Sequence, residues 1–215
     1  SRAGMGLNYK YLLYFKRDRI WDVLTGLAKI CDTRGMTPTT IHFPDRDLVL
    51  PLMSSWGEKT EAAHDQPEFE FDTSIYFDED PAILEYLHDR DGDEFDRSPP
   101  DENADRRYAI GFIYLTVYAD LSKHYAFKQP TDMVLFEFNT TGTRMSMLFE
   151  ESTSIRDTFT GLLSRFDGII GILDREVDYG ELFWFKGKVY EPYDKSVLNV
   201  YTTRDEVEEM LRRDW

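Results

Sequence analysis

The sequence has few of the residues from which covalent or metal-based frameworks are built. It contains a single cysteine, Cys31, so no disulfide can form within the chain and no cysteine-rich zinc site is available. The four histidines lie far apart, and none belongs to an HExxH motif or another close pair of metal ligands. We therefore expect no metal site, and we interpret Cys31 as a small buried residue on the apolar side of a helix.

Features that define other broad classes of protein are also missing. No apolar run reaches the roughly 18 residues of a membrane-spanning helix, and no signal-peptide pattern is present. No cluster of lysine and arginine offers the positive charge that nucleic-acid binding requires. Phosphate-binding glycine loops and the GxSxG motif are absent, so no cofactor or catalytic residue is predicted. We expect a cytoplasmic protein with no membrane or nucleic-acid partner.

Negative charge is what the sequence has in excess, and one segment holds nearly all of it. The net charge is −16, and residues 58–105 carry 18 acidic but only 3 basic side chains. Solubility could explain such a segment, but so could a basic protein partner, which we favour. The charged, proline-containing stretch 89–107 is expected to form an acidic loop. The predicted partner-binding residues in this loop are Asp89, Asp91, Asp93, Glu94 and Asp96.

The spacing of the aspartates in the acidic loop also suggests a calcium site of the EF-hand type. Asp89, Asp91 and Asp93 match the first odd positions of such a loop, but the sixth position is Glu94 and the twelfth is Pro100. Because the required glycine and the bidentate glutamate are both absent, we favour a solvated loop.

The pattern of apolar residues predicts an α+β fold with mostly antiparallel strands and about four helices. We expect one domain over residues 5–215, with residues 1–4 a remnant of a cloning vector. Strands are predicted at 9–15, 69–77 and 108–119, and hairpins at 39–53, 133–149 and 181–190. Helices are predicted at 20–31, 81–87, 155–173 and 203–211.

Two segments of the chain resemble one another. The stretch SIYFDEDPAI (74–83) aligns with SMLFEESTSI (146–155), and a weaker copy begins at YLLYFKRDRIW (11–21). We interpret all three as a strand that ends in phenylalanine, followed by a helix whose first amides are capped by Asp18, by Asp80, and by either Ser152 or Ser154. This repeat suggests a duplicated, ferredoxin-like arrangement with halves at about 5–119 and 130–215.

Paired acids lie within the two similar segments, at the predicted strand-to-helix junctions: Asp78–Glu79 and Glu150–Glu151. If the repeats packed side by side, these four carboxylates could converge on a metal ion or raise one another's pKa. We favour the simpler interpretation that they stabilise the start of a helix through its dipole.

The strand predicted at 108–119 places aromatic residues on one face and small or aliphatic residues on the other. Packing against a second layer is one explanation for the aromatic face; a homodimer interface or an apolar ligand pocket is another, with Tyr114 and Tyr118 as its polar tips.

Three classes of function remain. We favour a noncatalytic interaction protein, of the inhibitor or immunity type, whose acidic segment binds a basic protein. The second class is a small-molecule-binding protein or enzyme with an aromatic and carboxylate-lined pocket. The third is a dimeric structural component without a ligand. A salt-dependent association would distinguish the first class from the others.

Overall fold

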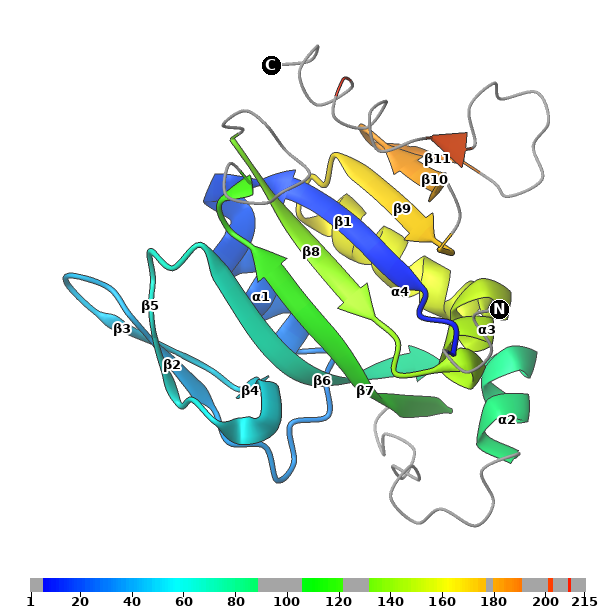
Figure 1. Ribbon diagram of the computed structural model, residues 1–215, viewed down its shortest axis with the longest axis horizontal. Helices are drawn as coiled ribbons and strands as arrows, with labels where there is room; N and C mark the ends of the chain where they lie inside the picture. Colours follow the sequence, from blue (N-terminus) through cyan, green and yellow to red (C-terminus); the bar gives the residue numbers. More distant parts are fainter. Residues whose placement is uncertain are drawn as a thin grey trace.

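The computed structural model describes residues 6–88, 106–121, 132–176, 180–190, 201–202 and 209. This part of the chain is α+β, with four α-helices and two sheets whose strand pairs are mostly antiparallel. Figure 1 shows α1 and α4 behind the large sheet and the small sheet projecting from one side of it. Of the predicted helix at 203–211, only Glu209 belongs to the described residues, and it is helical.

The large sheet has the strand order β11-β10-β9-β1-β8-β7-β6-β4, and β12 pairs with β10. The apolar segment at 10–16 forms the central strand β1, which is paired on both sides and has buried residues on both faces. The strands are β1 (Lys10–Lys16), β4 (Met53–Ser54), β6 (Glu68–Asp78), β7 (Arg107–Tyr118), β8 (Met133–Asn139), β9 (Ile170–Asp174), β10 (Gly180–Phe185), β11 (Lys188–Val189) and β12 (Tyr201–Thr202).

Helices cover one face of the large sheet and bury the main core. Phe159 of α4 lies at the centre of this core, with its ring centroid 4.6 Å from those of both Tyr11 and Phe138. Burial of each such aromatic side chain contributes about 2–3 kcal/mol to folding. The helices are α1 (Ile20–Ala28), α2 (Pro81–His88), α3 (Thr143–Glu151) and α4 (Thr153–Arg165), and the short 3₁₀ segments are η1 (Arg17–Arg19) and η2 (Ser55–Gly57).

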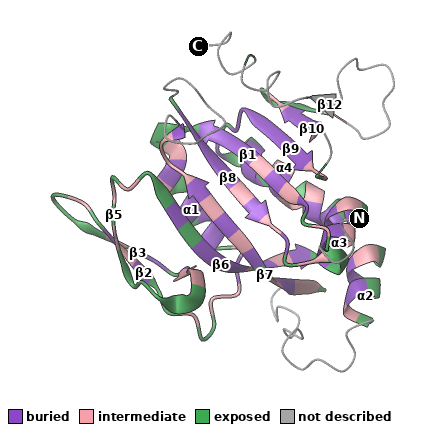
Figure 2. Ribbon diagram, in the orientation of Figure 1, coloured by how far each residue is buried: buried purple, intermediate pink, exposed green. Residues whose placement is uncertain are grey.

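The small sheet contains the hairpin predicted at 39–53. Strand β2 (Thr39–His42) lies between β3 (Asp47–Leu50) and the parallel strand β5 (Glu61–Ala63). The hairpin is confirmed, and β3 is an edge strand, as Pro51 indicated. Figure 2 shows buried and intermediate residues alternating along the second half of β7, whereas β8 is mostly buried.

The second predicted hairpin is wrong in its second strand, because residues 144–149 belong to helix α3. Strand β8 already pairs with β1 on one side and with β7 on the other, so a hairpin partner has no free edge to join. Met145, Leu148 and Phe149 also have helical spacing, and all three are buried.

The third predicted helix is too long. It ends at Arg165, and Ile170 and Leu173 belong to strand β9. A tight turn reverses the chain between these elements: the amide of Gly168 donates to the carbonyl of Leu163 over 2.6 Å. A Cβ on Gly168 would lie 2.8 Å from the Cα of Leu163, so the close approach requires glycine.

The repeated segments adopt different structures. The first copy runs from strand β6 into α2, as predicted, whereas the second runs from helix α3 into α4. The strand–helix prediction is therefore wrong for the second copy, and a duplicated ferredoxin-like arrangement is not confirmed. Asp18 lies within η1 and does not cap α1, whose first residue is Ile20. Asp80 and Ser152 do act as caps, because each accepts a hydrogen bond from an amide three residues later.

Candidate functional site

A bulge in β7 determines which of its side chains reach the face opposite the main core. Strand register pairs Ile75 with Ile110 and Thr73 with Ile113, so two residues of β7 lie opposite Ser74. The extra residue shifts the alternation, and Ile110 and Ile113 both enter the main core. The single aromatic face predicted for 108–118 is thus divided, and beyond the bulge Tyr114 and Tyr118 project from the other side of the sheet.

Beyond the bulge, acidic residues share this outer face with the two tyrosines. Register places Glu68, Glu70 and Asp72 of β6 opposite Tyr118, Thr116 and Tyr114 of β7, and Glu137 and Asn139 of β8 lie next along the same rows. We call these eight residues the acidic sheet face. Because alternate residues of a strand point to the same side, the face follows from the acidic alternation of EFEFD in β6 once the register is known.

The carboxylates of Glu68 and Glu70 lie close together. Burial, the negative charge of Glu70 and a hydrogen bond with it raise the pKa of Glu68, and the charge of Glu137 adds to this shift. Glu137 is paired with Lys10, whose Nζ lies 3.4 Å from its Oε1. Among the described residues, no lysine or arginine forms an ion pair with Glu68 or Glu70. Within the described part of the chain, no ion pair offsets the repulsion between these two carboxylates.

Trp56 stands beside the acidic sheet face. Its side chain is 75% exposed, and its backbone adopts a left-handed conformation with a φ of 63°. The amide of Trp56 donates to Oδ2 of the buried Asp72 over 2.9 Å, which holds η2 against β6. The indole ring lies 5.9 Å from the ring of Tyr114, at an interplanar angle of 36°. An exposed indole and a phenol ring therefore form a small aromatic wall.

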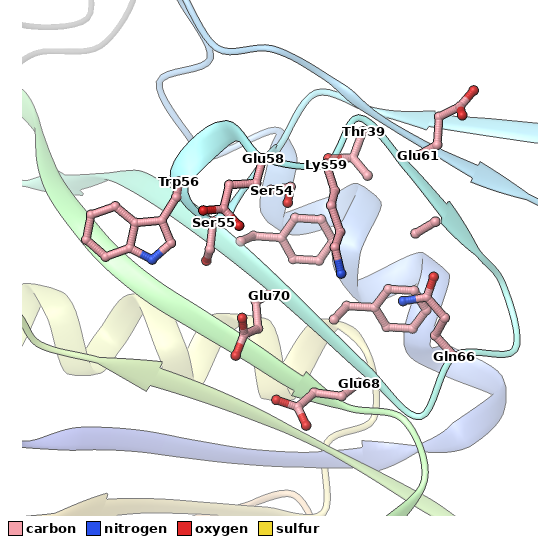
Figure 3. A pocket seen from close by; sticks show the side chains of 13 residues that line it. Thr39, Ser54, Ser55, Trp56, Glu58, Lys59, Glu61, Gln66, Glu68 and Glu70 are labelled. Atoms are coloured by element: carbon pink, nitrogen blue, oxygen red, sulfur yellow. The ribbon is translucent and has the colours of Figure 1, made fainter.

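Two hollows lie beside Trp56 and share Ser55, Trp56 and Glu70 in their linings. The first hollow, of about 290 Å³, lies between β6 and the small sheet. Figure 3 shows Glu68 and Glu70 along β6 at its base, with Lys59 extending over it from the loop after η2. The second hollow, of about 530 Å³, lies over β7 and β8 and includes Tyr114, Thr116 and Asn139.

The other residues predicted from the sequence lie at different places in the described structure or outside it. Tyr114 lines the second hollow, and Tyr118 packs at the border of a smaller apolar cluster on the outer face. Asp89, Asp91, Asp93, Glu94 and Asp96 lie outside the described residues. Cys31 is buried as expected, but it lies beyond the end of α1, in an isolated bridge with Ile75. Burial raises the pKa of its thiol to about 12.

Each pair of acids within the two similar segments includes one residue with a basic neighbour. Glu79 lies 3.4 Å from Arg106, and Glu150 lies 3.0 Å from Arg175. Within the described ranges, no group of three or more histidine, cysteine, aspartate or glutamate side chains has the arrangement needed to hold a metal ion. The structure therefore lends no support to convergence of these carboxylates on a metal.

Comparison with protein-family models, with curated proteins and with solved structures found no match. None of the helices that the structure describes is both long and apolar enough to cross a bilayer. We therefore infer function from the geometry of the acidic sheet face and Trp56. Sequence reasoning missed Trp56, because nothing in SSWG distinguishes an exposed indole from a buried one.

Proposed function

We propose that this is a noncatalytic interaction protein whose acidic sheet face binds a basic segment of another protein. The observation that supports this proposal is the adjacent pair Glu68 and Glu70, which no cation of the described chain neutralises. Two close carboxylates on an exposed strand face repel one another, and a bound cation removes that repulsion. A positively charged partner therefore binds more tightly, because its binding relieves the repulsion between these two carboxylates in the free protein.

The shape of the region favours a polypeptide segment as the occupant. The hollows on either side of Trp56 share one wall, so one extended segment could place basic side chains in both. Acidic side chains line the first hollow at Glu58, Glu61, Glu68 and Glu70, against the single basic residue Lys59. Charge of one sign over a surface accelerates association with a partner of opposite sign and makes it salt-dependent.

A small-molecule ligand is a second candidate. The second hollow has a volume within the range of about 300–1,000 Å³ typical of ligand sites, and it combines Tyr114 with the amide of Asn139. A dimer built through the same face would instead appear as a change in molecular mass with concentration.

The test compares two double variants that lose the same charge. Glu68→Gln/Glu70→Gln removes the carboxylate pair, whereas Glu85→Gln/Asp157→Asn removes two exposed helical acids. Titration calorimetry with arginine- and lysine-rich peptides at low and high salt should show binding that weakens about tenfold or more in the first variant and little in the second. Equal binding by the two variants, or binding indifferent to salt, would refute the proposal.

A third variant locates the binding surface. It carries Asn or Gln at Asp89, Asp91, Asp93, Glu94 and Asp96. If this variant alone fails to bind, the partner docks on the acidic loop, and the acidic sheet face is not the site.

A further inference from the structure

We propose that Trp56, Tyr114 and Glu70 form an anchor site for a guanidinium group, namely an arginine side chain of the basic partner. This inference rests on the proposed function and specifies the chemistry of its central contact. The three residues come from η2, β7 and β6, and all three line the second hollow.

The backbone of Trp56 is held in a strained conformation. A left-handed conformation is unfavourable for a bulky residue, and glycine or asparagine would occupy the position with less strain. The indole is three-quarters exposed and is not part of the main core, so core packing does not offset that strain. Residues held in such conformations cluster at ligand sites, where the surrounding structure maintains them. Here Asp72 maintains the turn through its hydrogen bond to the Trp56 amide.

The side chains around the indole are suited to binding a cation. Cations bind over the faces of tryptophan and tyrosine rings, and the Trp56 and Tyr114 rings are neighbours, 5.9 Å apart between centroids. The carboxylate of Glu70 belongs to the same hollow and forms no ion pair with any described residue. Asp72 is only 4% exposed, and its Oδ1 atom has no hydrogen-bond partner among the described residues, so an acceptor oxygen is left unpaired behind the turn.

The combination of an aromatic wall with a carboxylate selects for the shape of the cation. A guanidinium is planar, so it can stack on the indole while its N–H groups donate to both oxygens of Glu70. A lysine ammonium is a compact and strongly hydrated charge that can satisfy only one of these contacts well. The site should therefore prefer arginine to lysine.

The experiment uses N-acetyl-arginine amide and N-acetyl-lysine amide as probes and observes the indole N–H signals by NMR. The Trp56 signal is assigned from its absence in Trp56→Gly. We expect a saturable shift of that signal with the arginine probe and binding at least about fivefold weaker with the lysine probe. Because the Trp56 variants lack this signal, titration calorimetry measures probe binding to them. Trp56→Gly and Trp56→Asn should lose arginine-probe binding, and their melting temperatures should equal or exceed that of the wild type. Trp56→Phe should retain part of the affinity.

Three results would overturn the anchor: an unshifted Trp56 signal, equal affinity for the two probes, or a clear fall in melting temperature for both Trp56→Gly and Trp56→Asn. The last result would show that Trp56 is retained for stability. Failure of the anchor is distinct from failure of the proposed function. If basic peptides bind the wild type and Trp56→Gly equally, the anchor is wrong and the acidic sheet face stands. If the arginine probe binds but basic peptides do not, the anchor is a small-molecule site and the polypeptide proposal fails.

Discussion

The hydroxyl of Ser152 donates a hydrogen bond of 2.6 Å to Oδ2 of Asp80, which joins the start of α4 to the start of α2. The same carboxylate oxygen accepts from the amide of Ser154, and Oδ1 accepts from the amide of Ile83. Asp80 and Ser152 occupy equivalent positions in the two similar segments of the sequence, 72 residues apart. The helix caps of the two similar segments thus contact one another directly, although the elements that precede the caps differ.

Asp80→Ala should destabilise the protein by about 2–4 kcal/mol, because one carboxylate satisfies amides of two helices as well as the Ser152 hydroxyl. Asp80→Asn retains one acceptor oxygen and should lose about half as much. Urea unfolding measures both changes, with the exposed Asp78→Asn as the control. A loss below about 0.5 kcal/mol for Asp80→Ala would show that water replaces the carboxylate at both helix starts.

Glu68→Gln should stabilise the protein at neutral pH. The pKa of Glu68 is raised in the folded state, so the folded protein holds this proton more tightly than the unfolded chain does. Above that raised pKa the charged side chain destabilises the fold, and glutamine removes the cost. The advantage should decrease as the pH falls through the raised pKa and disappear below the ordinary value of 4.5. Melting temperatures from pH 3.5 to about 8 test this, with a variant of an exposed helical acid, Glu85→Gln, as the control.

His42 should make the small sheet more stable at mildly acidic pH. Its Nδ1 lies 2.7 Å from Asp47 of β3 and its Nε2 lies 3.4 Å from Glu61 of β5, and the hydrogen bond to Asp47 raises its pKa above 6.5. The stabilisation is complete below pH 6.5 and is lost as the pH rises through the raised pKa. An NMR titration should show the imidazole pKa fall in Asp47→Asn. An unchanged pKa in that variant would mean that Asp47 is not the dominant partner.

Glu181→Ala should destabilise the protein by about 3–5 kcal/mol, because it leaves the mostly buried Arg156 without its counter-charge. Glu181 is 3% exposed, its Oε1 lies 2.9 Å from Arg156, and its Oε2 lies 3.8 Å from Arg175. The double variant Glu181→Leu/Arg156→Met should recover much of the loss, since apolar residues often replace a buried ion pair at little cost. Chemical unfolding of the two variants measures the difference. An equal loss in both would place the destabilisation in packing around Arg175.

Structures defined by a few neighbouring residues could be predicted from the sequence. The hairpin at 39–50 follows from its turn residues and apolar alternation, and α2 follows from Asp80 and Pro81 at its start. The long strand β6 is recognisable from its alternating pattern. Each of these signals acts over fewer than about a dozen residues, so no distant partner is needed to interpret it.

The features that could not be predicted depend on contacts between distant segments of the chain. Residues 144–149 form a helix because β1 and β7 already occupy both edges of β8, which are pairings with distant segments. The bulge opposite Ser74 divides the aromatic residues of β7 between two faces, and only the register with β6 reveals it. The sequence determined that β6 alternates acidic and aromatic residues. Strand pairing across tens of residues decides which face of the sheet carries the acids. The same pairing places Trp56 beside them, because side-chain neighbours in a sheet come from other strands.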